Sequence, residues 1–213
     1  MPLALVDLDD TLVDRDDAYR RWAADFAAEH ALDPDAVAWL IEADEQGYAN
    51  RLDLFTRARD RFALRADAAD LDEAYYAVWP GYLRAFTDVP EALGELRAAG
   101  WAIAIVTNGG PGQAQKVVAA GLDRLVDGVA VSRLVGAAKP DARIFHAAAA
   151  MAGSSLDGAW MVGDHPAFDI GGGQALGLRT IWIARGRTWL EPDHEPTAIV
   201  ETFAEAARVM LGA

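Results

Sequence analysis

Four groups of polar residues stand at or just beyond the ends of short apolar runs. They are Asp7, Asp9 and Thr11; Thr107 and Asn108; Lys139; and Asp164 with Asp169. Each group alone has an ordinary structural explanation, because Asp and Thr after a strand commonly cap the next helix. Together they predict a site rich in carboxylates that also holds an ammonium group.

Several carboxylates around one crevice repel one another, so such crowding requires a compensating cation. The chain has no cysteine and its 4 histidines are scattered, which leaves oxygen as the ligand atom. Oxygen ligands favour a hard cation, and Mg²⁺ commonly binds one or two carboxylates together with phosphate oxygens. Lys139 and the hydroxyl group of Thr107 are suited to hold further phosphate oxygens. Phosphoryl transfer requires this set, together with an in-line nucleophile.

Short apolar runs predict the strands that would bring these groups together. The runs are residues 3–6, 102–106, 129–131, 160–162 and 180–184. They are apolar on both faces and are bounded by Gly or polar residues, as buried strands of a parallel sheet are. Amphipathic stretches between them predict crossover helices at residues 91–99, 113–120, 142–152 and 170–175. The alternation predicts an α/β fold with a Rossmann-like, doubly wound parallel sheet, in which ligands bind at the carboxyl ends of the strands.

The stretch from residue 14 to residue 87 breaks this alternation. It contains no strand-like run, and its aromatic residues, such as Trp22, Phe26 and Phe55, recur at helical spacing among many charges. We interpret these aromatic residues as the core of an inserted, all-helical cap domain. The predicted domains are therefore a catalytic core of residues 1–13 plus 88–213 and a helical cap of residues 14–87.

Composition narrows the expected partners and compartment. The formal net charge of −14 repels polyanions, so we expect no nucleic-acid partner. No apolar run approaches the roughly 18 residues that a membrane-spanning helix needs, so we expect no membrane partner. The N-terminus lacks the basic start and long apolar stretch of a secretory signal, which favours a cytoplasmic protein.

The sequence resembles the haloacid dehalogenase superfamily, in the branch with a small helical cap inserted after the first strand. The matching stretches are Asp7-Leu8-Asp9-Asp10-Thr11-Leu12, Ile105-Val106-Thr107-Asn108-Gly109, Lys139-Pro140-Asp141 and Val162-Gly163-Asp164 with Asp169. These stretches run through nearly all of the sequence outside the insertion. The insertion itself matches in position, size and helical character.

The resemblance implies that the protein is a magnesium-dependent phosphatase. Asp7 would attack phosphorus and form an aspartyl-phosphate. Asp9 would protonate the leaving alcohol and then activate water for the second step. Asp7, Asp164 and the backbone carbonyl group of Asp9 would bind Mg²⁺.

The resemblance also implies which residues bind the phosphoryl group. Thr107 and Lys139 would contact its oxygens, and Asn108 would shape the phosphate-binding loop through its backbone. Asp169 would orient Lys139 or a metal-bound water. Thr11 would support the site.

Three other activities are known on similar scaffolds. Dehalogenases of this superfamily lack an acid at the position of Asp9, because a halide leaves without a proton, so Asp9 favours phosphate chemistry. A phosphosugar mutase would return the phosphoryl group to a bound sugar, and the motifs do not distinguish it from a phosphatase. A non-enzymatic phosphoacceptor regulator also uses acids, Thr and Lys-Pro, but its phosphorylated Asp follows a middle strand.

Residues 45–51 interrupt the helical pattern of the insertion, and Gly47 permits a turn there. We predict that this loop faces the active site, with Tyr48, Asn50 or Arg51 in contact with substrate. Arg51 suits an ordinary surface ion pair equally well. By analogy, a small cap favours a small phosphorylated metabolite as substrate. The sequence leaves the oligomeric state open between a monomer and a homodimer.

Overall fold

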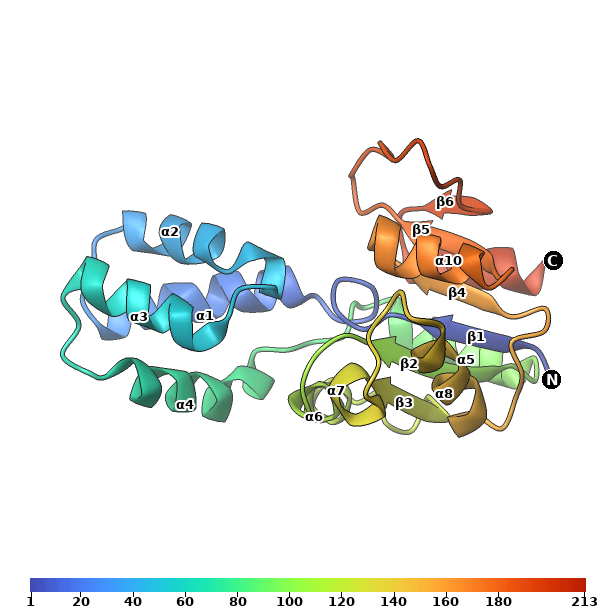
Figure 1. Ribbon diagram of the computed structural model, residues 1–213, viewed down its shortest axis with the longest axis horizontal. Coiled ribbons are helices and arrows are strands. Elements are labelled where there is room, and N and C mark those ends of the chain that lie inside the picture. The colour runs from blue at the N-terminus through green and yellow to red at the C-terminus, as the bar shows by residue number, and fades with distance from the viewer. The chain divides into compact units, whose positions relative to one another are not determined.

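The computed structural model describes residues 1–213 and divides into two compact units. The α/β unit comprises Met1–Asp14 and Ala85–Ala213. The helical unit, Arg15–Arg84, contains no strand. Figure 1 shows the elements of both units.

Six parallel strands form the sheet of the α/β unit, in the order β3-β2-β1-β4-β5-β6. Their bounds are β1 Leu3–Val6, β2 Ala102–Thr107, β3 Gly128–Val131, β4 Trp160–Gly163, β5 Arg179–Ile183 and β6 Ala198–Val200. The strand order reverses at β1, so the predicted doubly wound, Rossmann-like sheet is confirmed. The edge strand β6 was not predicted, because three residues, none of them fully buried, leave no apolar run to detect.

The helices of the α/β unit connect and cover these strands. They are α5 Val89–Ala98, α6 Gly112–Ala119, α7 Ser132–Val135, α8 Ala142–Met151, α9 Gly172–Ala175 and α10 Phe203–Leu211. The helix predicted at residues 170–175 is in part wrong, because a π-helical turn (η3, Pro166–Gly171) precedes α9. The short α7 and the C-terminal α10 were not predicted. α10 begins with a capping box in which Thr202 and Glu205 satisfy each other's backbone N–H groups.

Burial on both faces explains why the central strands are apolar throughout. Every residue of β1, β2 and β4 is buried. On one face, Leu5 of β1 and Ala104 of β2 belong to the same buried cluster as Ile144 and Phe145 of α8. Covered on both faces, these three central strands hold apolar side chains up to their last residues, so their polar chemistry is confined to the strand ends.

The helical unit has a core of aromatic side chains. Its helices are α1 Arg15–Glu29, α2 Asp35–Ala43, α3 Arg51–Phe62 and α4 Ala68–Val78, with 3₁₀ turns at Glu45–Gly47 (η1) and Trp79–Gly81 (η2). The Trp22 ring lies 4.9 Å from that of Tyr75 and 5.9 Å from that of Phe55, both edge-on. Edge-to-face pairs at these separations are favourable, so α1, α3 and α4 pack through their aromatic residues.

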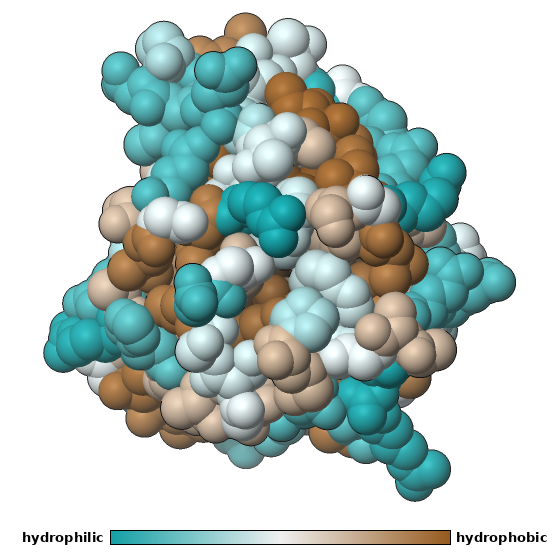
Figure 2. Space-filling model, turned by 90° about the vertical axis from the view of Figure 1, so that its right-hand side faces the viewer, coloured by the Kyte–Doolittle hydropathy of each residue, from teal (hydrophilic) through white to brown (hydrophobic).

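None of the helices combines the length and the apolar character needed to cross a membrane. On the face of the α/β unit seen in Figure 2, hydrophobic residues form separate groups among hydrophilic ones.

The core packing of α8 against the sheet predicts a large effect of truncating Phe145. Its side chain is fully buried, so Phe145→Ala is expected to lower the free energy of unfolding by about 3–5 kcal/mol through lost contacts and a cavity. Urea denaturation measures this change. The matched control is Leu134→Ala on α7, whose side chain is 64% exposed, with an expected change within about 0.5 kcal/mol. Equal effects of the two substitutions would contradict the packing described.

Candidate active site

Strand register brings the predicted polar residues to one edge of the sheet. Val6, the last residue of β1, pairs with Ile105 of β2 and with Val162 of β4. Asp7 follows directly, and its N–H donates to the carbonyl oxygen of Val162 at 2.9 Å. Thr107 ends β2 and Asp164 follows β4. These side chains therefore start from neighbouring strand ends at the point where the strand order reverses.

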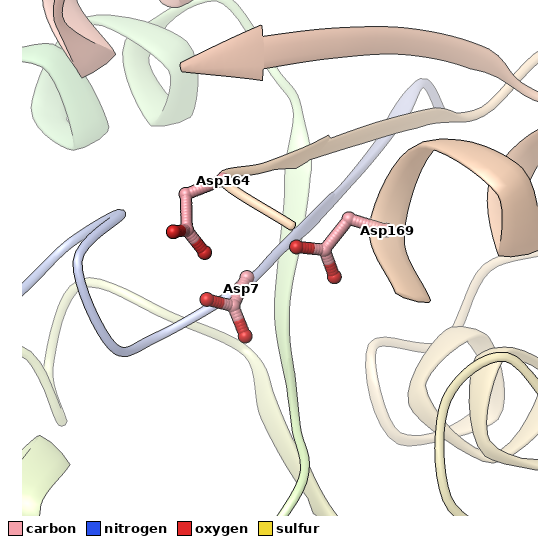
Figure 3. Close-up of side chains that lie close together, drawn as sticks. All are labelled: Asp7, Asp164 and Asp169. Atoms are coloured by element: carbon pink, nitrogen blue, oxygen red, sulfur yellow. The ribbon is translucent and has the colours of Figure 1, made fainter. Parts of the chain in front are cut away.

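Three carboxyl groups converge at this edge. One oxygen atom from each of Asp7, Asp164 and Asp169 lies within 4.8 Å of the others, and Figure 3 shows the three side chains close together. Asp169 is fully buried and Asp7 is nearly so. A set of buried oxygen donors suits a hard divalent cation such as Mg²⁺. The carboxyl group of Asp9 does not belong to this cluster, whereas that of Asp169 does.

The electrostatics of the cluster favour a bound cation. Burial raises the pKa of Asp7 well above its ordinary value; Lys139 opposes this shift, and the carboxylates of Asp169 and Asp164 reinforce it. Burial and the neighbouring Asp169 likewise raise the pKa of Asp164 to about 6, against the guanidinium group of Arg187. When ionised, the three carboxyl groups also outnumber the two cations that pair with them, Lys139 and Arg187, so a further cation would lower the cost of ionising them.

Lys139 supplies an ammonium group to this cluster. Its Nζ donates to Oδ1 of Asp7 at 2.5 Å and to Oδ1 of Asp169 at 2.7 Å, and the side chain is buried. Burial by itself lowers the pKa of Lys139, but the carboxylates of Asp169 and Asp7 outweigh it, so the net pKa is raised. Lys139 therefore stays charged beside Asp7.

The backbone of Lys139 is held by the side chain of Asn108. The Asn108 Nδ2 donates to the carbonyl oxygen of Lys139 at 3.1 Å, and its Oδ1 accepts from the Lys139 N–H at 2.8 Å. This reciprocal pair links the loop after β2 to the loop that carries the ammonium group. The side chain of Asn108 is thus engaged with the backbone of Lys139, and a role of Asn108 in phosphate binding through its own backbone stays a prediction.

The two threonines predicted for the site, Thr107 and Thr11, differ in the hydrogen bonds of their hydroxyl groups. Oγ1 of Thr107 accepts a hydrogen bond of 2.6 Å from Nε2 of Gln113, and this acceptor role leaves its own proton available for donation. Thr11 is fully buried and its Oγ1 has no hydrogen-bond partner.

Asp169 is fixed by the chain immediately before it. Its Oδ2 accepts from the N–H of His165 at 3.0 Å. A Cβ atom at position 163 would lie 2.2 Å from the same oxygen atom, so a glycine is required at the end of β4. His165 opens the π-helical turn, because its Nδ1 accepts from the N–H of Phe168 at 3.2 Å. Burial lowers the pKa of His165, which suits this acceptor role of a neutral imidazole.

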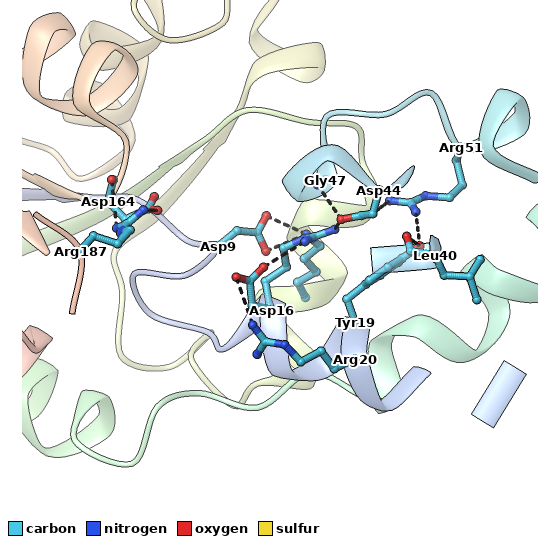
Figure 4. A network of polar contacts seen from close by, with 12 residues as sticks. Asp9, Asp16, Tyr19, Arg20, Leu40, Asp44, Gly47, Arg51, Asp164 and Arg187 are labelled. Carbon is cyan, nitrogen blue, oxygen red and sulfur yellow. Dashed lines mark hydrogen bonds and ion pairs between the residues drawn. The ribbon is translucent and has the colours of Figure 1, made fainter. Parts of the chain in front are cut away.

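Three partners of the acidic residues were not predicted from the sequence. Nζ of Lys116 lies 2.8 and 2.7 Å from the two carboxyl oxygens of Asp9, and Nε2 of Gln113 donates to Oδ2 at 2.9 Å. Arg187 contacts Oδ2 of Asp164 at 3.0 Å, as Figure 4 shows. Lys116 and Gln113 stand three apart on one face of α6, but this spacing does not indicate a partner elsewhere in the chain, so no signal in the sequence indicated their contact with Asp9. Arg187 lies outside the regular elements and gave no such signal.

The substrate-contact residues predicted from the sequence lie in the helical unit. Tyr48 is exposed, and Asn50 caps α3 by accepting from the N–H of Asp53 at 3.1 Å. A surface ion pair for Arg51 is wrong, because its largely buried guanidinium group lies 2.8 Å from Asp44 (Figure 4). The same group lies over the Tyr75 ring, 4.6 Å from its centroid. Contact of these three residues with substrate stays a prediction.

Comparison with proteins of known activity gives relatives that are named as phosphatases and relatives that are named as haloacid dehalogenases. Phosphoserine phosphatase from Thermus thermophilus is 38% identical over 170 residues, which cover 79% of this chain and 66% of the relative. Glyceraldehyde 3-phosphate phosphatase from Pyrococcus abyssi is 30% identical over 191 residues, covering 85% and 80%. An (S)-2-haloacid dehalogenase from a Pseudomonas species is 35% identical over 159 residues, covering 69% and 68%. The chain thus spans just under two thirds of the first of these relatives.

Solved structures share the whole fold. The magnesium-bound HAD-hydrolase YfnB from Bacillus subtilis superposes with a TM-score of 0.80 at 24% identity, over 98% of both chains. The HAD phosphatase from Thermococcus onnurineus gives a TM-score of 0.69 at 24% identity, over 99% of this chain and 98% of its own.

The motif residues therefore lie at the strand ends of the doubly wound sheet, as the resemblance implies. In addition, the family profile described as haloacid dehalogenase-like hydrolase matches residues 1–177. The chain belongs to the haloacid dehalogenase-like hydrolase family.

Proposed function

We propose that this chain hydrolyses the phosphate monoester of a small metabolite, with Asp7 as the covalent nucleophile and Mg²⁺ as cofactor. The observation that carries the proposal is the convergence of Asp7, Asp164 and Asp169 on one point, with the ammonium group of Lys139 hydrogen-bonded to Asp7. This arrangement combines a buried nucleophile, a set of oxygen ligands and a cation for phosphate oxygens.

In the first half-reaction, a carboxylate oxygen of Asp7 attacks phosphorus and the bond from phosphorus to the ester oxygen breaks. Asp9 gives a proton to that oxygen, which leaves as an alcohol. The phosphoryl group is then bound to Asp7 as an acyl phosphate. Lys139 and the hydroxyl group of Thr107 stabilise its non-bridging oxygens, whose negative charge they complement.

In the second half-reaction, water attacks the phosphorus atom of the aspartyl-phosphate. Asp9, now a carboxylate, takes a proton from that water as it attacks. The bond between phosphorus and Asp7 breaks, which releases inorganic phosphate. Asp7 is again a carboxylate and Asp9 again carries its proton, so the cycle is closed.

The donor set fits Mg²⁺, which would be held by Asp7, Asp164 and the backbone carbonyl group of Asp9. When bound, Mg²⁺ neutralises negative charge on the phosphoryl oxygens and on the carboxylates. Asp169 is less suited as a direct ligand, because its two oxygens already accept from Lys139 and from the N–H of His165. We assign Asp169 the task of orienting Lys139.

Asp9 favours phosphate hydrolysis over dehalogenation. Halide leaves as a stable anion, whereas an alkoxide leaving group needs a proton. The two phosphatase relatives are named for phosphoserine and for glyceraldehyde 3-phosphate, both of which are small alkyl phosphates. A substrate of this class would need the proton that Asp9 supplies.

The role of Asp7 predicts the outcome of one conservative change. Wild-type protein is expected to release phosphate from p-nitrophenyl phosphate with Mg²⁺ and to lose this activity in EDTA. Asp7→Asn removes the nucleophile and is expected to lower kcat by about 1000-fold or more. A malachite-green assay measures the released phosphate.

The matched control is Asp10→Asn, three residues further along. Asp10 has φ +56°, a conformation that Asn adopts readily, and its backbone groups bond to Val13 and Arg185. This variant is expected to retain most of the activity. Phosphate release by Asp7→Asn at the wild-type rate would refute the mechanism, and chloride release from 2-chloropropionate without phosphatase activity would indicate a dehalogenase.

The carboxylate cluster predicts how Mg²⁺ changes thermal stability. A ligand present at 100 times its Kd stabilises the native state by about 2.7 kcal/mol, so the Tm of the wild type is expected to rise with Mg²⁺. Asp164→Asn removes a ligand, and the rise is expected to vanish. In EDTA this variant is expected to be at least as stable as the wild type, because the raised pKa of Asp164 means that its ionised form is disfavoured in the folded state.

Differential scanning fluorimetry measures both effects, and Asp123→Asn, a change at an exposed position, serves as the control that keeps the Mg²⁺ response. A Tm rise of equal size in Asp164→Asn would exclude Asp164 as a metal ligand.

A further inference from the structure

Two side chains of α6 contact the carboxyl group of Asp9. Lys116 donates to both oxygens, at 2.8 and 2.7 Å. Gln113 donates to Oδ2 at 2.9 Å. Both donors lie on one face of the helix, since they are three residues apart. Neither of them belongs to the motifs that identify the family resemblance.

Gln113 also joins Asp9 to the neighbouring strand end. Its Nε2 carries two protons and donates to Oγ1 of Thr107 at 2.6 Å as well as to Asp9. The side chain is buried. A Cβ atom at position 109, where φ is +151°, would lie 2.7 Å from Cγ of Gln113, so Gly109 leaves the space that the Gln113 side chain occupies. The backbone after β2 is thus shaped around this contact.

The ion pair between Lys116 and Asp9 is partly shielded from water. The exposed fractions of the two side chains are 12% and 25%. Pairs with limited exposure are screened less than surface pairs. Two donors on a helix that starts directly after the β2 loop therefore restrict how the carboxyl group of Asp9 can turn.

We propose that Lys116 and Gln113 are positioning residues that hold Asp9 for proton transfer to the leaving alcohol. The inference rests on the proposed phosphatase function. A general acid must lie within hydrogen-bond reach of the oxygen that receives its proton, and fixed orientation is worth a large factor in rate. Two donors that hold one carboxyl group supply this orientation.

The proposal predicts an effect that depends on the leaving group. An alkyl phosphate needs the proton from Asp9, whereas p-nitrophenolate is a stable anion and depends on it far less. Lys116→Met keeps the aliphatic stem and removes the ammonium group. It is expected to lower kcat/KM for phosphoserine by about 100-fold and kcat/KM for p-nitrophenyl phosphate much less. Steady-state kinetics on both substrates measure the ratio.

Two further variants complete the experiment. Gln113→Leu removes the second donor and is expected to change the ratio in the same direction, which provides an independent test if Lys116→Met folds poorly. Arg97→Met is the control, because it removes a cation from another ion pair of the α/β unit, that with Asp127 at 2.8 Å. The ratio in this control is expected to equal that of the wild type.

A double-mutant cycle tests whether Lys116 acts through Asp9. In the Asp9→Asn background, Lys116 has no carboxylate to hold, so adding Lys116→Met is expected to change kcat/KM for phosphoserine by less than about twofold. A full additional loss in that background would overturn the proposal, because Lys116 would then act on something other than Asp9.

Equal losses for the two substrates, or no loss for either, would also overturn the proposal. These results differ from a failure of the phosphatase function itself. If the phosphatase function failed, the wild type would release no phosphate, or Asp7→Asn would remain active. Either result would also overturn the positioning role of Lys116 and Gln113.

Discussion

The site depends on one buried charge arrangement, the ammonium group of Lys139 between the carboxylates of Asp7 and Asp169. Charges with so little exposure are costly to desolvate unless their partners are fixed with good geometry. The fold provides that geometry from several directions. Asn108 holds the backbone of Lys139, and the N–H of His165 holds Asp169. Burial raises the pKa of Asp7 despite the nearby Lys139, and a divalent cation would favour its ionised form.

The parallel sheet explains why such distant residues meet. β1 occupies the middle of the strand order and is paired on both sides, so the residue after it lies between the ends of β2 and β4. Interior positions of these strands accept apolar side chains alone, because both faces are covered. The strand ends are the first positions where carboxylates fit. The doubly wound topology thus gathers at one edge the polar groups that the sheet itself excludes.

The parts of the site that the sequence predicts are those that follow directly from strand ends. Asp7, Thr107 and Asp164 were located because a buried strand is a continuous apolar run. Lys116 and Gln113 were missed because they lie on a helix and not at a strand end. Their contact with Asp9 depends on the loop of residues 108–111, and the periodicity of the sequence does not predict the conformation of a loop. The short β6 gave no apolar run to detect, whereas α10 was overlooked although its buried residues Phe203, Ala206 and Met210 stand at helical spacing. Of the two alternatives for Arg51, the surface ion pair was wrong, because the charge of Arg51 conceals that an ion pair with Asp44 and the Tyr75 ring permit burial.

The geometry also separates two chemical tasks on one scaffold. The proposed nucleophile Asp7, the ammonium group of Lys139 and the proposed metal ligands lie in the segments that follow β1, β3 and β4. The proposed acid, Asp9, is held from α6, and a hydrogen bond from Gln113 to Thr107 links the two groups. Attack by a carboxylate is common to phosphate and halide displacement, whereas the proton is needed for an alcohol alone. Relatives that act on phosphate esters and relatives that remove halide can therefore share the first group of residues and differ in the second.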